Sequence, residues 1–266
     1  EIDRALRRLD ARDQAGVDGR MIELDGTANK SRLGANAMLG VSMAVARAAA
    51  QAGGVPLWQY LAGERKPALP LPMINIFSGG LHAGRQLEFQ DFLVIPHGCG
   101  ALPAALEAAV AIHRAAGRVT SEAGYVLTGV ADEGGWGPRL ESNQTALELL
   151  VRAIRAAGFE PGAEVSIALD VAATHFFDEG VYRLESEGRT LTSSGMTDLL
   201  EGWMERYPIV SIEDPLAEDD WEGWKHLTGR LGSRSKLVGD DLFATNPERL
   251  ERGIREGVAN AVLVKM

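Results

Sequence analysis

Four short apolar runs between residues 165 and 265 each end in charged side chains. They close on Asp170, on Glu213–Asp214, on Asp240–Asp241 and on Lys265. Runs rich in Val, Ile and Leu with little polar alternation are typical of strands buried on both faces, which would place each charge at the carboxyl end of a strand. Carboxylates are hard oxygen ligands for divalent cations, and a lysine beside them can act as a base. The pattern therefore predicts a metal-assisted enzyme site.

An alternative is that each carboxylate caps a helix or pairs with an Arg or Lys at the rim of the sheet. One strand-end acid does not distinguish the two interpretations. Three acids in series, Asp170, Glu213 and Asp240, followed by Lys265, favour the metal site. Three carboxylates that converge without a cation would repel one another strongly at low dielectric, so together they imply a bound cation.

The elements that must position these charges alternate between strand and helix. Expected strands cover residues 165–170, 208–213, 236–240 and 261–265, with helices that begin near Thr192, at a cap on Asp219 or Asp220, and at Asn246-Pro247. Such alternation predicts parallel pairing, and carboxylates at several strand ends favour a (β/α) barrel, whose active face is at those ends. Upstream, strands are expected over 73–77 and 91–95, and helices over 102–116 and 143–157.

The first part of the chain is expected to form a separate domain. An alanine-rich helix over residues 35–52 is closed by Gly53-Gly54, and the segment 63–72 contains three prolines that interrupt helices and central strands. We therefore expect an N-terminal domain over 1–65 and a barrel domain over 66–266. A barrel that stopped after a strand at 261–265 would have an open edge, so the sequence is interpreted as a fragment.

Bulk properties exclude several classes of protein. The net charge of −10 argues against a general nucleic-acid or anionic-membrane surface. No apolar stretch approaches the ~20 residues of a membrane span. The single cysteine, Cys99, fits a reducing cytoplasm and an inert thiol. We expect a cytoplasmic protein with a small-molecule substrate, no nucleic-acid partner and no membrane span.

Five stretches, in order, resemble the enolase family. They are Leu24–Ala37, Gly79–Ala83, Asp132–Pro138, Ala168–Ala173, and Ser211–Trp221 running on to Val238–Phe243. The resemblance implies an enolase-type (β/α) barrel, incomplete at its C-terminal end, preceded by the helical remainder of an N-terminal α+β domain. It also implies a lyase of glycolysis and gluconeogenesis that dehydrates 2-phosphoglycerate to phosphoenolpyruvate, with two Mg²⁺ ions in the complete enzyme. A homo-oligomer, dimer or octamer, and secondary display at the cell surface are further implications.

Residue by residue, the resemblance assigns roles in the site. Asp170, Glu213 and Asp240 match the metal ligands, and Lys265 matches the lysine that abstracts the substrate proton, with a pKa expected to be lowered by nearby Mg²⁺. Glu133 and Asp91 match two acids that assist loss of the hydroxyl group on carbon 3. His82 matches a loop histidine on the phosphoryl side of the substrate. These last two acids, His82 and Lys265 are also the expected substrate-binding residues, whereas His97, His113, His175 and His226 match no motif and are interpreted as packing or surface residues.

The departures from the family pattern leave alternatives open. Asp91 stands where the family usually has Glu, which retracts the carboxyl group by roughly 1.5 Å. Ser78 replaces the usual Asn, Ala131 the usual Gly, and Thr174-His175 the usual Ser-Glu. One alternative is a paralogue acting on a related phosphorylated or phosphonylated three-carbon acid. Another is a non-catalytic moonlighting scaffold, although a scaffold has no need to gather repelling carboxylates.

Overall fold

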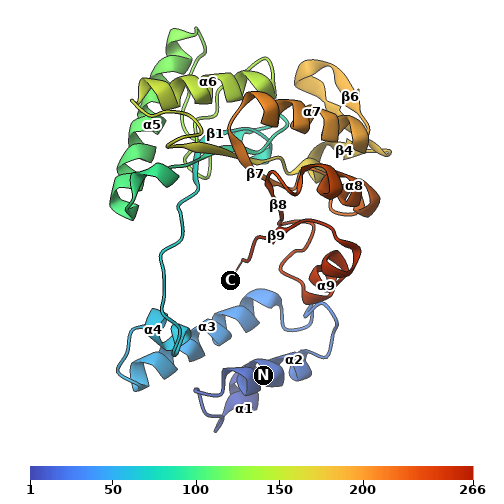
Figure 1. Ribbon diagram of the computed structural model, residues 1–266. Helices are drawn as coiled ribbons and strands as arrows, with labels where there is room; N and C mark the ends of the chain where they lie inside the picture. Colours follow the sequence, from blue (N-terminus) through green and yellow to red (C-terminus); the bar gives the residue numbers. More distant parts are fainter. Residues whose placement is uncertain (266) are drawn as a thin grey trace. The chain divides into compact units, whose positions relative to one another are not determined.

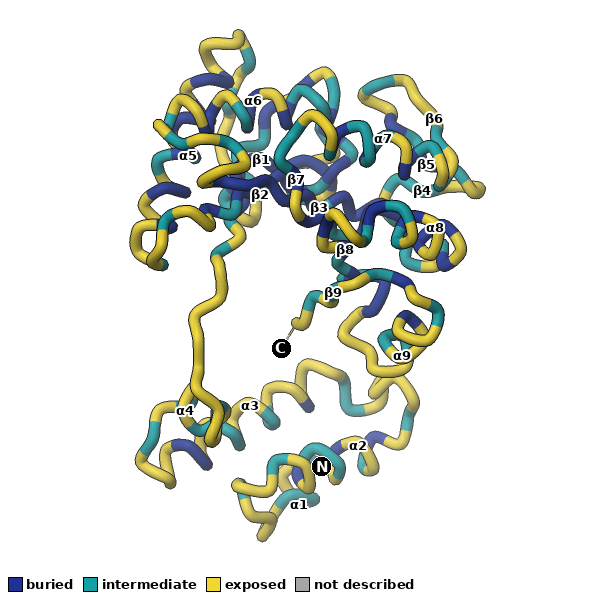
Figure 2. The backbone as a smooth tube through the Cα atoms, in the orientation of Figure 1, coloured by how far each residue is buried: buried dark blue, intermediate teal, exposed yellow. Residues whose placement is uncertain are grey.

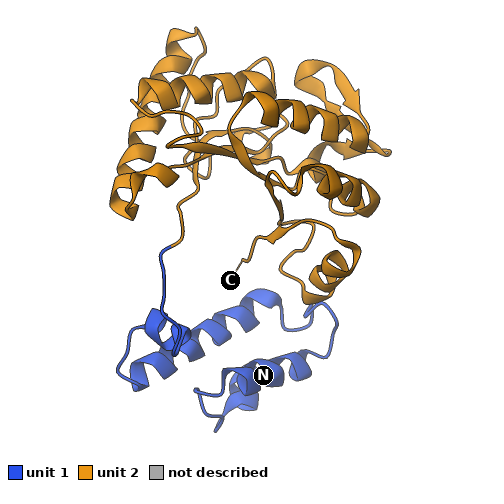
Figure 3. Cartoon of the chain, viewed as in Figure 1, with its two compact units in different colours: residues 1–69 blue, residues 70–266 orange. Residues whose placement is uncertain are grey.

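The structure is a computed structural model that describes residues 1–265. Contacts divide the chain into two compact units, Glu1–Leu69 and Pro70–Met266 (Figure 3). The division falls inside the proline-containing segment 63–72. No helix of the described residues is both long and apolar enough to cross a bilayer.

The first unit is helical. Its described residues form four helices, α1 (Ile2–Leu6), α2 (Gln14–Asp25), α3 (Ala35–Ala52) and α4 (Leu57–Ala62). Helix α3 has the limits predicted from the alanine-rich pattern. The buried carboxylate of Asp25 accepts hydrogen bonds from the backbone N–H groups of Thr27 (3.0 Å) and Leu33 (2.7 Å), which shapes the connection between α2 and α3.

The second unit is mixed α/β (Figure 1). Its main strands and helices are β1 (Ile74–Ser78), β2 (Asp91–Ile95), α5 (Leu102–Glu122), α6 (Asn143–Ala156), β3 (Ser166–Asp170), α7 (Ser193–Arg206), β7 (Ile209–Glu213), α8 (Trp221–Leu231), β8 (Lys236–Gly239), α9 (Pro247–Glu256) and β9 (Ala261–Val262). Between β3 and α7 the chain forms a small sheet that was not predicted, of β4 (Phe177–Asp178), β5 (Val181–Leu184) and β6 (Arg189–Leu191). Short 3₁₀ turns, η1 (Leu81–Ala83), η2 (His97–Cys99), η3 (Ala173–Phe176) and η4 (Glu185–Glu187), fill several connections.

The main sheet has the order β1-β2-β3-β7-β8-β9. Strands β3, β7, β8 and β9 pair in parallel, as the alternation of strands and helices predicts. Strand β2 is antiparallel to both β1 and β3. The physical reason lies in the connections: β1 and β2 are joined without a crossover helix, and α5 and α6 carry the chain across and back before β3. The sequence pattern did not predict this reversal.

Local signals set the helix starts. The predicted caps are confirmed for Asp220, whose side chain accepts from Gly223 N–H (3.1 Å), and for Asn246, which accepts from Glu248 N–H (2.8 Å). The last strand is shorter than predicted. Strand β9 ends at Val262, because its pairing with β8 ends at Gly239–Val262, and Lys265 lies beyond the strand.

The core lies between the sheet and its helices. Strands β2 and β3 are almost wholly buried, and the buried tube segments of β1, β2, β3 and β7 gather at the centre of the unit (Figure 2). Phe77, Phe92, Ile167, Ile212 and Trp203 are among the buried apolar side chains. This core holds the strand ends in register, and those ends carry the acids described next.

Candidate active site

Strand register brings three of the predicted acids into one row across the sheet. Asp91 begins β2 and is the register partner of Asp170 at the end of β3, and Asp170 is in turn the partner of Glu213 at the end of β7. Laterally paired residues project their side chains from the same face. Asp240 follows β8 by one residue. Asp91, Asp170, Glu213 and Asp240 therefore lie at one edge of one sheet.

One acidic group consists of Glu213, Asp214 and Asp240, each of which offers one oxygen within 4.8 Å of the others. Asp170 lies outside this group but beside it, and one of its oxygens accepts a hydrogen bond from Gln90 Nε2 (3.0 Å). The carboxylates of Asp170, Glu213 and Asp240 offer a hard, all-oxygen donor set at this sheet edge. This chemistry suits a small divalent cation and does not suit a soft metal.

Electrostatics point to the same need for a cation. Burial, followed by repulsion from Asp91, raises the pKa of Asp170 to about 8. Burial, followed by repulsion from Asp170, raises the pKa of Glu213 to about 9. Burial and mutual repulsion thus disfavour ionisation of these two carboxylates near neutral pH, and the Lys265 amine offsets this only in part at Glu213. A divalent cation among these oxygens would supply further positive charge.

Lys265 reaches this acidic group from beyond β9. Its Nζ lies 2.6 Å from Asp240 Oδ2, and its backbone N–H donates to Thr245 Oγ1 (3.1 Å). The hydrogen bond to Asp240 raises the pKa of Lys265, which is opposite in direction to the lowering expected from Mg²⁺. The reason is that Asp240 offers negative charge to the ammonium group, and a cation on Asp240 would compete for the same oxygen.

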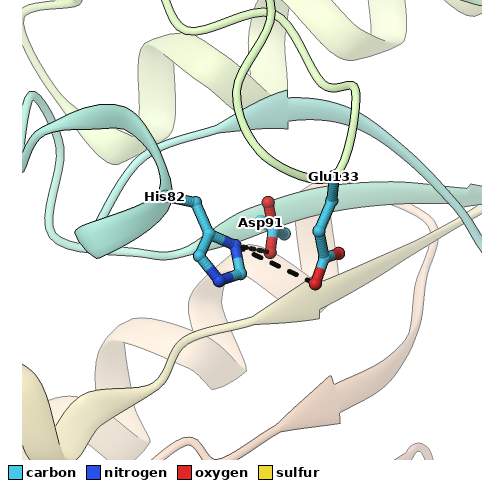
Figure 4. Close-up of side chains that lie close together, drawn as sticks. All are labelled: His82, Asp91 and Glu133. Carbon is cyan, nitrogen blue, oxygen red and sulfur yellow. Dashed lines mark hydrogen bonds and ion pairs between the residues drawn. The ribbon is translucent and has the colours of Figure 1, made fainter.

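A second cluster joins His82, Asp91 and Glu133 (Figure 4). His82 comes from the turn η1, Asp91 from the start of β2 and Glu133 from the connection between α5 and α6. His82 Nδ1 lies 3.1 Å from Asp91 Oδ2 and 4.0 Å from Glu133 Oε1. Asp91 is buried, and that burial is the largest cause raising its pKa. Because Asp91 also repels Asp170, the two clusters adjoin.

Comparison with known proteins identifies the family. A family model described as the enolase C-terminal TIM barrel domain matches residues 66–266, and one described as the enolase N-terminal domain matches residues 1–61. The chain belongs to the enolase family. A curated relative, Enolase 2 of Pseudomonas syringae pv. syringae (strain B728a), is 50% identical over 266 residues, which are 100% of this chain and 62% of that protein. The chain thus spans less than two thirds of the length of this enolase.

The family confirms the predicted fold class. The sheet of the described residues has six strands in open order, which is part of the TIM barrel that the enolase description names. The helical unit precedes it, as predicted for the remainder of an N-terminal enolase domain. The acidic row lies at the carboxyl ends of the parallel strands β3 and β7, where active sites of such barrels form.

Asp214 is a residue of the acidic group that was not among the predicted site residues. It is buried, has a φ of +40°, and its carboxylate accepts hydrogen bonds from the backbone N–H groups of Asp240 (3.1 Å) and Asp241 (2.7 Å). Burial raises its pKa to about 7. Its oxygens are thus occupied in holding the loop after β8, which carries Asp240. The signal in the sequence was the acidic pair Glu213-Asp214.

His113, which we expected to be a packing or surface residue, packs against the loop that presents Glu133. Its ring stacks on that of Trp136, with 4.9 Å between the ring centroids, and its Nε2 donates a hydrogen bond to the carbonyl oxygen of Gly134 (2.9 Å). Trp136 Nε1 donates in return to the His113 carbonyl oxygen (2.9 Å). These contacts hold the loop that presents Glu133. No sequence motif marks His113, because its partners lie about twenty residues away on a loop.

The acidic edge of the sheet predicts how stability depends on pH. The pKa values of Asp170 and Glu213 in the folded chain, about 8 and about 9, lie above their ordinary values. Their protonated forms are therefore favoured by folding, and this stabilisation is complete below about pH 4 and is lost as the pH rises through the folded pKa values. We expect the Tm of the chelator-treated protein to fall by on the order of 5–10 °C between pH 6 and pH 9.

Thermal unfolding in EDTA and in excess Mg²⁺ checks this expectation. Mg²⁺ should stabilise the protein most at pH 9, because the carboxylates ionise fully when they bind a cation. A Tm in EDTA that rises from pH 6 to pH 9 would contradict the assigned electrostatics.

Proposed function

We propose that the full-length protein binds Mg²⁺ through Asp170, Glu213 and Asp240 and dehydrates 2-phosphoglycerate to phosphoenolpyruvate. The observation that carries the proposal is the row of acids at one sheet edge, with the Lys265 amine 2.6 Å from Asp240 Oδ2, in a chain of the enolase family. When bound, Mg²⁺ supplies positive charge where a second negative charge develops on the substrate carboxylate.

The chain's own residues handle the protons. Lys265 Nζ, as the neutral amine, accepts the proton of carbon 2, and the electron pair of that C–H bond stays on carbon 2. The pair then forms the double bond between carbons 2 and 3 as the bond from carbon 3 to oxygen breaks. The hydroxyl group leaves as water with a proton delivered from Glu133. Asp91 and His82 complete this acid side of the site.

The two halves of the reaction can be separated by a variant of Glu133. Replacing Glu133 with Gln keeps the shape of the side chain but removes its proton. We expect formation of phosphoenolpyruvate to slow by about 10²–10³-fold, while exchange of the carbon-2 proton with solvent continues. Both rates are measured on 2-phosphoglycerate, in H₂O and in D₂O.

A matched control lies in the same connection. Glu141 is exposed, and Glu141→Gln should leave both rates within about twofold of the natural protein. Equal loss of exchange and dehydration in Glu133→Gln would remove Glu133 from the role of leaving-group acid.

The same assignment leads to proposals for the pathway, the location, the oligomeric state and the domain limits of the protein. We place the reaction in glycolysis and gluconeogenesis, in the cytoplasm, with the protein working as a homo-oligomer, and we propose domain limits of 1–65 and 66–266. Support comes from the family matches to residues 1–61 and 66–266. If a phosphonylated three-carbon acid reacts faster than 2-phosphoglycerate in the same assay, the paralogue alternative replaces the assigned substrate.

A further inference from the structure

Two residues that depart from the family pattern touch each other. Ser78 ends β1, Asp91 begins β2, and they are register partners on adjacent strands. Ser78 Oγ donates a hydrogen bond to Asp91 Oδ1 at 2.7 Å, and Asn75 Nδ2 donates to the same oxygen. Both Ser78 and Asp91 are almost completely buried. The two departures therefore form one contact within the site.

The remaining oxygen of Asp91 faces the histidine. Asp91 Oδ2 lies 3.1 Å from His82 Nδ1, and an ionised carboxylate can only accept, so the proton of this hydrogen bond belongs to Nδ1. In the neutral ring, Nε2 of His82 is then the acceptor. The contact thus selects one tautomer of His82.

The side chains of His82, Asp91 and Glu133 differ in how far they are exposed to solvent. The side chain of Asp91 is 2% exposed, that of His82 is 24% exposed and that of Glu133 is 54% exposed. With both oxygens engaged and almost no exposed surface, Asp91 is not available to a ligand in the way that His82 and Glu133 are.

We propose that Asp91 is a positioning residue, which orients His82 and sets its tautomer, and that Ser78 is the partner that makes this shorter acid effective. The groups that meet the substrate on this side are then His82 and Glu133. The catalytic part of this inference rests on the proposed function. The orientation and tautomer of His82 can be tested without substrate.

The space around Ser78 explains why the two residues must match in length. A Cβ atom on Gly135 would lie 2.7 Å from Ser78 Oγ and 2.8 Å from Asn75 Oδ1, so the loop that carries Glu133 is packed closely over this pair. Side chains of register partners project side by side. Asn at position 78 would place its amide where the Asp91 carboxylate lies, and Glu at position 91 would carry its carboxylate past Ser78 Oγ. When the side chains at positions 78 and 91 are both short or both long, the donor at position 78 stays within hydrogen-bond distance of the carboxylate at position 91.

A double-mutant cycle tests the match. In the full-length protein we expect Ser78→Asn and Asp91→Glu each to lower kcat/KM for 2-phosphoglycerate by at least about 10-fold, and the double variant to recover to within about threefold of the natural protein. Additive losses, which would leave the double variant the weakest of the three, would overturn the pairing of Ser78 with Asp91.

The nuclear magnetic resonance signals of the histidine ring report the positioning role directly. With ¹⁵N-labelled histidine and no substrate, His82 should show a protonated Nδ1 in the natural protein. Asp91→Asn and the milder Ser78→Ala should shift the His82 signals and lower kcat, by about 10-fold and about threefold respectively, with KM changed less. Unshifted His82 signals in folded Asp91→Asn protein would overturn the proposal.

Ser166 provides a matched control. It is a buried serine of the same sheet, at the far end of β3, and its hydroxyl lies 3.0 Å from His97 Nε2. Ser166→Ala should shift the signals of His97, leave those of His82 in place and keep kcat/KM within about twofold. The two proposals also fail separately. If the natural protein has no activity on 2-phosphoglycerate but Asp91→Asn shifts the His82 signals, the assigned substrate is wrong and the positioning role of Asp91 is supported.

Discussion

Replacing Lys265 with alanine is expected to abolish exchange of the carbon-2 proton of 2-phosphoglycerate with solvent. The amine lies 2.6 Å from Asp240 Oδ2, beside the acids that are proposed to hold Mg²⁺. Removing a positioned general base costs about 10²–10⁴-fold, and among the described residues no other lysine forms an ion pair with these acids. Exchange in D₂O, followed by nuclear magnetic resonance in the full-length protein, measures the step without requiring dehydration.

Two further lysine variants sharpen the result. Lys265→Arg keeps the positive charge but cannot become neutral near pH 8, so it should lose exchange as the alanine variant does. Lys236 begins β8, at the opposite end of the strand that leads to Asp240, and Lys236→Ala should exchange at the natural rate. Exchange that persists in Lys265→Ala would show that another group takes the proton.

Replacing Glu213 with glutamine is expected to have opposite effects on metal binding and on stability. Glu213 is one of the acids within 4.8 Å at the sheet edge, and its loss should weaken Mg²⁺ binding by more than about 100-fold. In EDTA at pH 8 the same variant should have a higher Tm than the natural protein. A neutral amide removes the cost of burying a carboxylate at this position and then the repulsion between Glu213 and Asp170.

Titration calorimetry with Mg²⁺ alone and thermal unfolding in EDTA measure the two effects. Glu205 is exposed near the end of α7, and Glu205→Gln should change neither. If Glu213→Gln binds Mg²⁺ as tightly as the natural protein, the assigned metal ligands are wrong. If it is also less stable in EDTA, the electrostatic account of the acidic edge fails as well.

The helix caps and strand ends could be predicted because their causes are local. The caps at Asp220 and Asn246 depend on a side chain reaching a backbone N–H two or three residues away, and the helix Ala35–Ala52 depends on composition and a closing glycine pair. Asp170 and Glu213 follow apolar runs, so their positions at strand ends could also be predicted from the sequence.

The contacts that decide how the site is built depend on the path of the chain between distant residues. Strand β2 reverses direction because α5 and α6 carry the chain across and back, and this reversal sets Asp91 against Asp170, 79 positions further along the chain (170 − 91). The bond of Ser78 to Asp91 and the support of the Glu133 loop by His113 arise in the same way.

The sequence by itself thus determined which residue types reach the active edge and which family's pattern they follow. Only the tertiary structure decided which of them touch. Strand ends and caps are set by interactions over a few residues, whereas strand register and loop packing are set by burying the whole core at once. That is why Asp91 could be predicted as an acid of the site from its motif, while its orientation toward His82 could not.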